Sequence, residues 1–167
     1  MNDSITVRAA SLEDAPRIAQ LHVTVFRESH GEGPPFALRL QQWQESLARQ
    51  DHFCFVLEER TQALVGFARG TPHDDVDGLR FDGELNKIYV LREYQGRGLG
   101  RRLVCAVCSE FVKRGVQSML LFGDAKSRSN GFYERLGAER LLSSEGEFHG
   151  GYGWHQLADL ARQCGGK

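Results

Sequence analysis

The sequence predicts a mixed α/β fold, and three observations support this prediction. Short β-rich runs alternate with segments in which apolar residues recur at helical spacing. Two hairpin patterns are present, one in the first half of the chain and one near its end. Between them, a strand pattern, a glycine-rich stretch and a helix pattern follow one another directly. The expected order is β-α-α-β-β-β-α-β-α-β-β, with strands on both sides of the strand–loop–helix unit.

The first third of the chain predicts one strand and two helices. The strand covers residues 5–10, "ITVRAA". We expect Ser11 to cap the next helix, because Asp14 stands three residues later, at the spacing of a capping box. The segment "HGEGPP" (30–35) ends this helix. A second amphipathic helix follows, with the apolar residues Phe36, Leu40, Trp43 and Leu47.

The middle of the chain predicts a hairpin and a central strand. Residues 53–59 and 63–70 are β-rich runs separated by "RTQ", which is typical of a hairpin. A polar, acidic loop follows over residues 71–83. Residues 84–91, "ELNKIYVL", have apolar residues on both faces toward their end, as a central strand should.

The last third predicts a long helix, a buried strand, a short helix and a hairpin. The long helix begins after the glycine-rich stretch and ends near Gly115. Residues 118–122, "SMLLF", form the buried strand, and residues 129–138 form a short helix that Gly137 stops. The tail from Glu139 to Leu157 resembles a β-hairpin. One side of the long helix consists of Leu99, Leu103, Val107 and Phe111.

Length and composition bound the class of protein. A chain of 167 residues suits one globular domain over residues 1–167. The formal net charge of -1 argues against a general nucleic-acid or membrane-surface binder. No apolar run approaches the ~20 residues that span a bilayer, and "MNDSITVRAA" lacks the layout of a signal peptide. We therefore expect a cytoplasmic location.

Three of the four cysteines are expected to be structural. Cys105 and Cys108 have the CxxC spacing of a redox pair or of half a zinc site, but no second CxxC or nearby His pair accompanies them. They fall in the middle of the long helix, which favours small apolar core residues. Cys54, in an apolar strand, has the same interpretation.

The stretch "YQGRGLGRRL" (94–103) predicts an anion site. A bare loop that opens a helix presents unpaired N–H groups at the positive end of the helix dipole, which suits a diphosphate. Gly96, Gly98 and Gly100 remove side chains from this backbone. Arg97, Arg101 and Arg102 add positive charge. The alternative is a turn that only lets the helix pack closely on a strand.

Two common phosphate-binding loops do not fit this stretch. A Walker loop needs GxxxxGK followed by Ser or Thr, which is missing here. The dinucleotide fingerprint needs GxGxxG, whereas this chain has GxGxG, with Arg101 in place of the third glycine.

The same residues resemble the GNAT superfamily, the acetyl-coenzyme-A-dependent N-acyltransferases. The family signature, Gln/Arg-x-x-Gly-x-Gly/Ala between a central strand and a long helix, is matched by Gln95, Gly98 and Gly100. "FYERLGAE" (132–139) resembles a second family motif, the "fYeklGF" helix end after the next strand. The element order matches too, so the resemblance covers most of the chain. It implies a mostly antiparallel mixed sheet with splayed central strands and flanking helices, and acetyl-CoA as co-substrate without a metal.

The resemblance also implies roles for individual residues. Backbone near Tyr89 and Val90 would bond the pantetheine arm, and Tyr133 would act as general acid at the sulfur. Many members place Asn seven residues before this tyrosine; this chain has Lys126 there, which could approach a coenzyme phosphate instead. The coenzyme pyrophosphate would be held by the amides of Gly96, Arg97, Gly98, Leu99, Gly100 and Arg101.

The chemistry of acetyl transfer suggests a base as well. An alkylammonium has a pKa of about 10.4 and must lose a proton before it can attack. Glu84 is our candidate, because the histone-acetylating branch of the family has its base glutamate at a similar distance before the signature. The plain alternatives are an exposed strand-end carboxylate for Glu84 and a buried, satisfied tyrosine for Tyr133. No nucleophile arrangement is evident, so we expect direct attack in a ternary complex.

The acceptor is expected to be a small-molecule amine. Acidic residues would attract a cationic amine, although runs of aspartate are usually solvated loops. Two alternatives stay open: the acceptor is a protein amine, or the domain is a non-catalytic acyl-CoA sensor. The edge strands of such a sheet could also pair in a homodimer. The segments expected to line the acceptor pocket offer Glu28, His30, Trp43, His73, Asp74, Asp75, Asp77 and His149.

Overall fold

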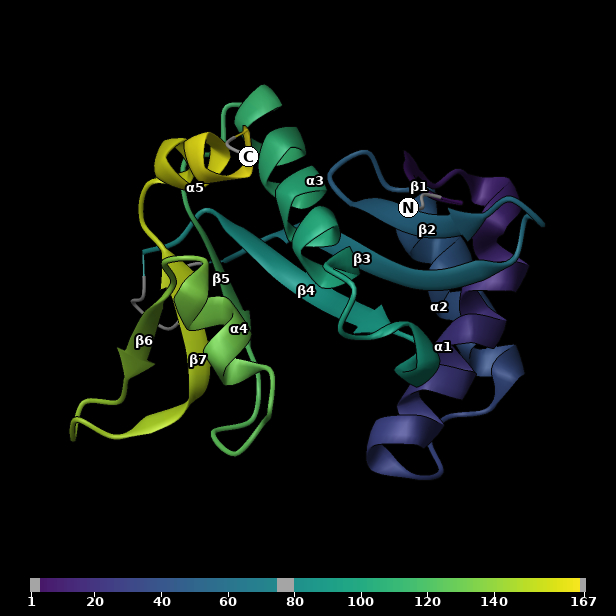
Figure 1. Ribbon diagram of the computed structural model, residues 1–167, viewed down its shortest axis with the longest axis horizontal. Coiled ribbons are helices and arrows are strands. Elements are labelled where there is room, and N and C mark those ends of the chain that lie inside the picture. Colours follow the sequence, from purple (N-terminus) through teal and green to yellow (C-terminus); the bar gives the residue numbers. More distant parts are fainter. Residues whose placement is uncertain (1–3, 75–79, 166–167) are drawn as a thin grey trace. The chain divides into compact units, whose positions relative to one another are not determined.

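The computed structural model describes residues 4–74 and 80–165. Seven strands form one sheet in the order β1-β2-β3-β4-β5-β7-β6 (Figure 1). The β4–β5 pair is parallel, whereas β1–β2, β2–β3, β5–β7 and β6–β7 are antiparallel. The predicted fold class, a mixed and mostly antiparallel sheet with helices, is therefore confirmed. The described residues divide into two compact units, 4–70 with 87–107, and 71–74 and 80–86 with 108–165.

The first unit contains an antiparallel meander and two helices. β1 (Ile5–Ala9) pairs with β2 (Phe53–Glu59), which forms the predicted hairpin with β3 (Leu64–Pro72). α1 (Ala15–His30) and α2 (Phe36–Leu47) pack against each other beside these strands (Figure 1).

Ser11 caps the first helical turn as predicted. The capping box is formed with Asp14, whose carboxylate accepts a hydrogen bond from the Ser11 amide at 2.8 Å. The turn is a short 3-10 helix, η1 (Leu12–Asp14), that continues into α1. Asp14 also binds the guanidinium of Arg8 on β1 at 2.9 Å, so the cap fixes the start of the helix to the edge strand.

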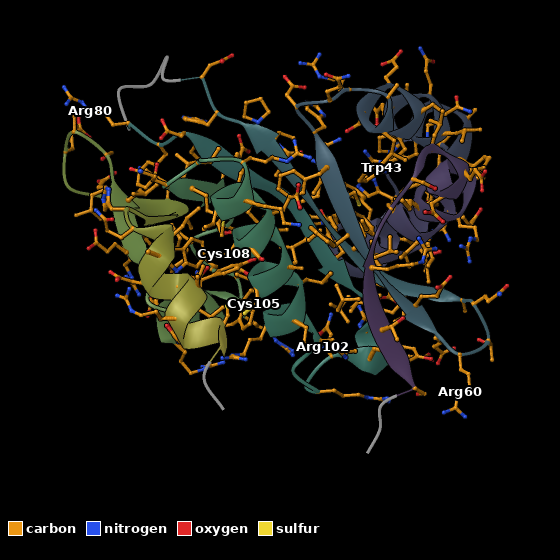
Figure 2. The ribbon with its side chains drawn as sticks, turned by 90° about the horizontal axis from the view of Figure 1, so that it is seen from above. Trp43, Arg60, Arg80, Arg102, Cys105 and Cys108 are labelled. Atoms are coloured by element: carbon orange, nitrogen blue, oxygen red, sulfur yellow. The ribbon has the colours of Figure 1, made fainter. Side chains whose placement is uncertain are left out.

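The core of the first unit lies between the two helices and strands β2 and β3. It is lined by Ala15, Ile18, Ala19, Leu21, Val25, Trp43, Cys54, Val56, Leu64 and Phe67. Figure 2 shows Trp43 on α2, facing this interior. Trp43 is only 1% exposed, so the expectation that it lines the acceptor pocket is wrong. Its indole N–H donates instead to Nδ1 of His22 at 3.0 Å.

The second unit contains the start of β4 and the C-terminal hairpin. β4 (Gly83–Val90) pairs with β5 (Met119–Phe122) through Gly83–Met119 and Glu84–Leu120. β5 pairs with β7 (Phe148–Trp154), and β7 pairs with β6 (Glu139–Leu142) in the predicted hairpin.

Three helices complete the chain. α3 (Leu99–Lys113) buries the predicted face of Leu99, Leu103, Val107 and Phe111. α4 (Asn130–Arg135) is the predicted short helix. α5 (Leu157–Gly165) was not predicted, so the expected element order lacks its last member. Among its nine residues, only Leu157 and Leu160 are buried. Two apolar residues are too few to distinguish a helix from the end of a strand.

The CxxC pair does not act as a unit. Cys54 and Cys108 are buried free thiols, as predicted, and burial raises the pKa of Cys108 to about 11. Cys105 is half-buried and disulfide-bonded, so its interpretation as a buried core thiol is wrong. Figure 2 shows Cys105 and Cys108 on α3. Since Cys108 is free, the two cysteines do not form a redox pair with each other.

Candidate functional site

The glycine turn before α3 is open at two positions. Gly96 and Gly98 have φ angles of 80° and 79°, in the left-handed region that favours glycine. A Cβ added to either residue would meet no atom within 4 Å. Gly100 lies within the first turn of α3. Bare backbone at Gly96 and Gly98 thus faces open space rather than a packed strand, against the interpretation of a turn kept for close packing.

The first turn of α3 presents donors to this space. The amide of Arg102 donates to the carbonyl of Gly98 at 3.3 Å and so starts the helical bonding. By helix geometry, the amides of Gly98, Leu99 and Gly100 have no acceptor within the helix, and the positive end of the helix dipole lies there. This end of α3 can therefore bind an anion.

The three arginines of the turn differ in their contacts. Arg97 lies over the ring of Tyr94, 4.9 Å from its centroid, and donates to the carbonyl of Glu93 at 3.2 Å. Arg102, labelled on α3 in Figure 2, donates to the carbonyl of Ile5 at 3.1 Å and so joins the helix to β1. Arg101 is half-buried in the first turn. Arg102 thus has a structural role in addition to its charge.

Gln95 joins the turn to the end of β4. Its side-chain amide donates to the carbonyl of Val90 at 3.0 Å. The amide of Leu91 donates to Val65 on β3 at 2.9 Å, so by strand alternation the backbone groups of Val90 face away from β3. Tyr89 instead places its ring in the core, 5.7 Å from the His22 ring centroid. Of the two predicted pantetheine positions, Val90 has the outward-facing backbone.

Glu84 lies in the second unit with two polar neighbours. Its Oε1 is 3.7 Å from Nδ1 of His73, and its Oε2 accepts a hydrogen bond from Asn86 at 3.1 Å. The Glu84 side chain is 19% exposed, so it is not a freely exposed strand-end carboxylate. Asn86 was not singled out from the sequence, although its position two residues later on a strand puts it on the same face.

Tyr133 lies against the C-terminal strand. Its ring centroid is 5.6 Å from that of Tyr152 and 6.4 Å from that of Trp154. The carbonyl of Tyr133 accepts the amide of Ala138 at 3.1 Å, and Gly137 has a φ of 87°. These are the bonds and conformation of a Schellman motif, which ends α4 and fixes the position of Tyr133 on its last turn.

Glu84 and Tyr133 approach the sheet from opposite faces. Glu84 is in register with Leu120, and Leu120 with Gly153, so all three point to one face. Tyr152 and Trp154 flank Gly153 and therefore point to the other face, where Tyr133 packs. The side chains of Glu84 and Tyr133 therefore lie on different faces of the sheet in this unit.

The loop after β5 has its own hydrogen bonds. The side chain of Asn130 donates to the carbonyls of Asp124 and Ala125, at 3.1 and 2.9 Å. The carboxylate of Asp124 accepts the amide of Lys126 at 2.9 Å. This fixes the loop backbone and leaves the Lys126 side chain exposed.

Of the six other acceptor candidates, the structure describes four. Glu28 accepts the amide of Arg92 at 3.0 Å, and His30 stacks on Phe26. His149 and Asp74 are exposed. Asp75 and Asp77 lie outside the described residues. Within the described ranges, no group of three or more His, Cys, Asp or Glu residues could hold a metal ion, and no helix is long and apolar enough to cross a membrane.

Comparisons with known sequences give the family. The model of the acetyltransferase (GNAT) family matches residues 15–138. The chain is 30% identical over 168 residues to YuaI, an uncharacterized N-acetyltransferase of Bacillus subtilis, covering 93% of this chain and 96% of that protein. It is 36% identical over 90 residues to the mycothiol acetyltransferase of Thermobispora bispora, covering 52% of this chain and 30% of that protein.

Solved structures share the fold. A Staphylococcus aureus N-acetyltransferase has a TM-score of 0.73 at 18% identity, covering 93% of this chain and 99% of that chain. YncA of Salmonella typhimurium, solved with acetyl-CoA, has a TM-score of 0.70 at 21% identity, covering 93% and 95% of the two chains. PaiA of Thermoplasma acidophilum, solved with coenzyme A, has a TM-score of 0.66 at 15% identity, covering 92% and 99%.

The family assignment rests on the sequence matches, because the identities to the solved structures are low enough to show the fold alone. The family model spans most of the chain, and YuaI is matched over nearly its whole length. This chain therefore belongs to the acetyltransferase (GNAT) family and is an acetyl-CoA-dependent N-acetyltransferase.

Proposed function

We propose that the chain, as one catalytic domain over residues 1–167, transfers an acetyl group from acetyl-CoA to the primary amine of a small molecule. The single observation that supports cofactor binding most strongly is the pair of open left-handed glycines, Gly96 and Gly98, directly before α3. Among the relatives, one is named for mycothiol, and a spermidine N-acetyltransferase of Vibrio cholerae has a similar fold. These names favour a small-molecule acceptor.

The turn residues would hold the coenzyme. Acetyl-CoA supplies the acetyl thioester when bound. The amides of residues 96–101 would donate to its pyrophosphate, where the dipole of α3 and Arg97 and Arg101 add positive charge. The backbone of Val90, which faces away from β3, would bond the pantetheine arm and orient the carbonyl. Lys126, whose side chain is exposed on its loop, would approach a coenzyme phosphate.

Glu84 would prepare the acceptor for direct attack. The carboxylate takes a proton from the ammonium, directly or through a water, and the neutral amine nitrogen then attacks the thioester carbonyl carbon. His73 and Asn86 hold the carboxylate in place, since each lies against a different carboxylate oxygen. A domain that only bound acyl-CoA would need no such base, so this arrangement favours catalysis over sensing.

Tyr133 would act at the other end of the reacting bond. As the carbon–sulfur bond breaks, its hydroxyl gives a proton to the departing thiolate and is then reprotonated from solvent. The Schellman motif that ends α4 and the packing on Tyr152 hold the ring in place for this step.

Thiol release from acetyl-CoA tests this proposal. The protein is assayed with a panel of amines, amino acids, polyamines, aminoglycosides and peptides. We expect steady release with at least one small amine and none with peptides. Release with peptides alone would identify a protein acceptor. Tight binding of coenzyme A without turnover across the whole panel would identify a sensor.

A further inference from the structure

The inward face of α2 buries two polar residues, Arg39 and Ser46, beside the apolar residues that cover the core. Arg39, Trp43 and Ser46 lie at positions i, i+4 and i+7 and are all buried. Arg39 is only 8% exposed. Arginine is almost never fully buried unless it is paired, so this position needs an explanation.

Arg39 has few partners for a buried guanidinium. Its Nη1 donates to Gln42 at 3.3 Å, and its Cζ lies 5.2 Å from the centroid of the Phe26 ring. Its Nε is buried and makes no hydrogen bond. Among the described residues, no carboxylate forms an ion pair with Arg39. A buried cation without a counter-ion costs several kcal/mol, so the protein keeps this group at a cost in stability.

The free edge of Arg39 has a defined shape. With Nη1 bonded to Gln42, the Nε–H and one Nη2–H remain as two parallel donors along one edge of the planar guanidinium. This is the fork that binds both oxygens of a carboxylate.

The surroundings of Arg39 are positively charged. Burial, with Arg39, Lys87 and Arg69 nearby, lowers the pKa of His22 to about 3, so His22 is neutral at physiological pH. Arg69 lies over the Trp43 ring at 5.1 Å and donates to Ser46 at 3.2 Å. Arg39 on α2, Arg69 on β3 and Lys87 on β4 thus surround His22 with positive charge inside the first unit.

We propose that the Nε edge of Arg39 binds a carboxylate of the acceptor, so the acceptor is an amine that also carries a carboxylate, such as an amino acid. The proposal rests on the function proposed above and names the substrate class. Tyr89 lies in the same cluster, against His22, and directly precedes Val90. The carboxylate is a binding group only and takes no part in the transfer. The carboxylate distinguishes this class from the purely cationic amines that an acidic loop would attract.

Matched pairs of substrates test the proposal. The twenty L-amino acids and their carboxamides are compared for thiol release, and for binding to the coenzyme-A-loaded protein by calorimetry. We expect at least one acid to exceed its carboxamide by about 10- to 100-fold in kcat/KM and in affinity, as for a hydrogen-bonded charge pair. Equal values for acids and amides, or no binding of any acid, would overturn the proposal.

Three variants assign the effect to Arg39. Arg39→Gln should abolish the preference for the acid and leave the affinity for coenzyme A unchanged. Arg39→Lys keeps the charge but loses the fork, and should retain part of the preference. Arg60→Gln, at an exposed arginine that Figure 2 shows at the far end of the same unit, is the control and should behave as wild type. A preference that persists in Arg39→Gln would contradict the proposal.

The two proposals fail in different ways. If no amine releases thiol, the catalytic proposal fails, while the calorimetric comparison of acids with carboxamides still decides the role of Arg39. If amines are acetylated without regard to their carboxylates, catalysis stands and the Arg39 proposal fails.

Discussion

The carboxylate of Glu84 has a neighbour on each of its two oxygens, which suits a base that must keep one orientation. His73 lies beside Oε1, and Asn86 donates to Oε2. If Glu84 takes the proton from the amine, the rate at low pH is limited by protonation of this carboxylate.

Glu84→Gln should therefore flatten the rising acid limb of kcat/KM and lower its plateau by ~10²-fold or more. The measurement is the pH profile of thiol release. Glu45→Gln, at an exposed glutamate of α2 that accepts a hydrogen bond from Gln41, is the matched control and should keep the limb. If the acid limb of kcat/KM persists in Glu84→Gln, a different group is the base.

Tyr133→Phe isolates the hydroxyl of the proposed acid. The ring keeps its packing against Tyr152 and Trp154, so we expect the fold to persist while kcat falls by ~10²-fold. Tyr152→Phe is the control. It removes a hydroxyl that bonds Glu134 at 2.6 Å, which should lower stability and leave kcat near wild type. An unchanged kcat in Tyr133→Phe would remove its role as acid.

At the scale of residues, local motifs were predictable and spatial neighbours were not. Gln95 and the glycines at 96 and 98 could be recognised, because their spacing along the chain is itself the signal. Trp43 was assigned to a pocket and is in the core, since an aromatic residue on an amphipathic helix suits either place. Arg39 gave no signal, because only the folded chain shows that its charge is buried.

At the scale of elements, turn chemistry decides where the helices begin and end. Ser11 and Asp14 start one helix, and Gly137 ends another. These boundaries could be predicted because the capping residues act locally. α5 was missed because only two of its residues, Leu157 and Leu160, are buried, and two apolar residues are too few to indicate a helix.

Gly98→Val tests the junction between β4 and α3. A β-branched residue disfavours the left-handed conformation at this position, so the amides that follow should be displaced and coenzyme A should bind more weakly. The protein should still fold, because the added Cβ meets no atom within 4 Å. Calorimetry with coenzyme A gives the affinity.

Gly115→Val is a matched control for this variant. Gly115 has a φ of 83°, follows the other end of the same helix, and also has no atom within 4 Å of an added Cβ. We expect similar strain and a similar loss of stability, but an unchanged affinity for coenzyme A. Equal affinities for wild type and Gly98→Val would contradict the pyrophosphate assignment.

At the scale of the whole molecule, the net charge does not show where the positive charges lie. The total of -1 gave no hint of the positive interior around His22, where Arg39, Lys87 and Arg69 act together. Composition counts charges but does not place them, so it could exclude classes of partner and could not identify the acceptor.

The neutral His22 links this interior to the stability of the protein. In the unfolded chain His22 binds a proton near its ordinary pKa of about 6.5, whereas in the folded protein it does so only near pH 3. Between these values the unfolded state binds more protons, so the free energy of unfolding falls as the pH falls. The loss from this one group between pH 7 and pH 5 should be about 2 kcal/mol.

His22→Gln should remove this loss. Glutamine does not titrate, and its side-chain oxygen can accept the hydrogen bond that Nδ1 of His22 accepts from Trp43. Urea unfolding of both proteins at pH 7 and pH 5 gives the comparison. Other groups, such as Asp14 with its lowered pKa, titrate equally in both and cancel in the difference. If the two proteins lose the same stability between these pH values, His22 is not held neutral, and the positive interior around Arg39 loses its support.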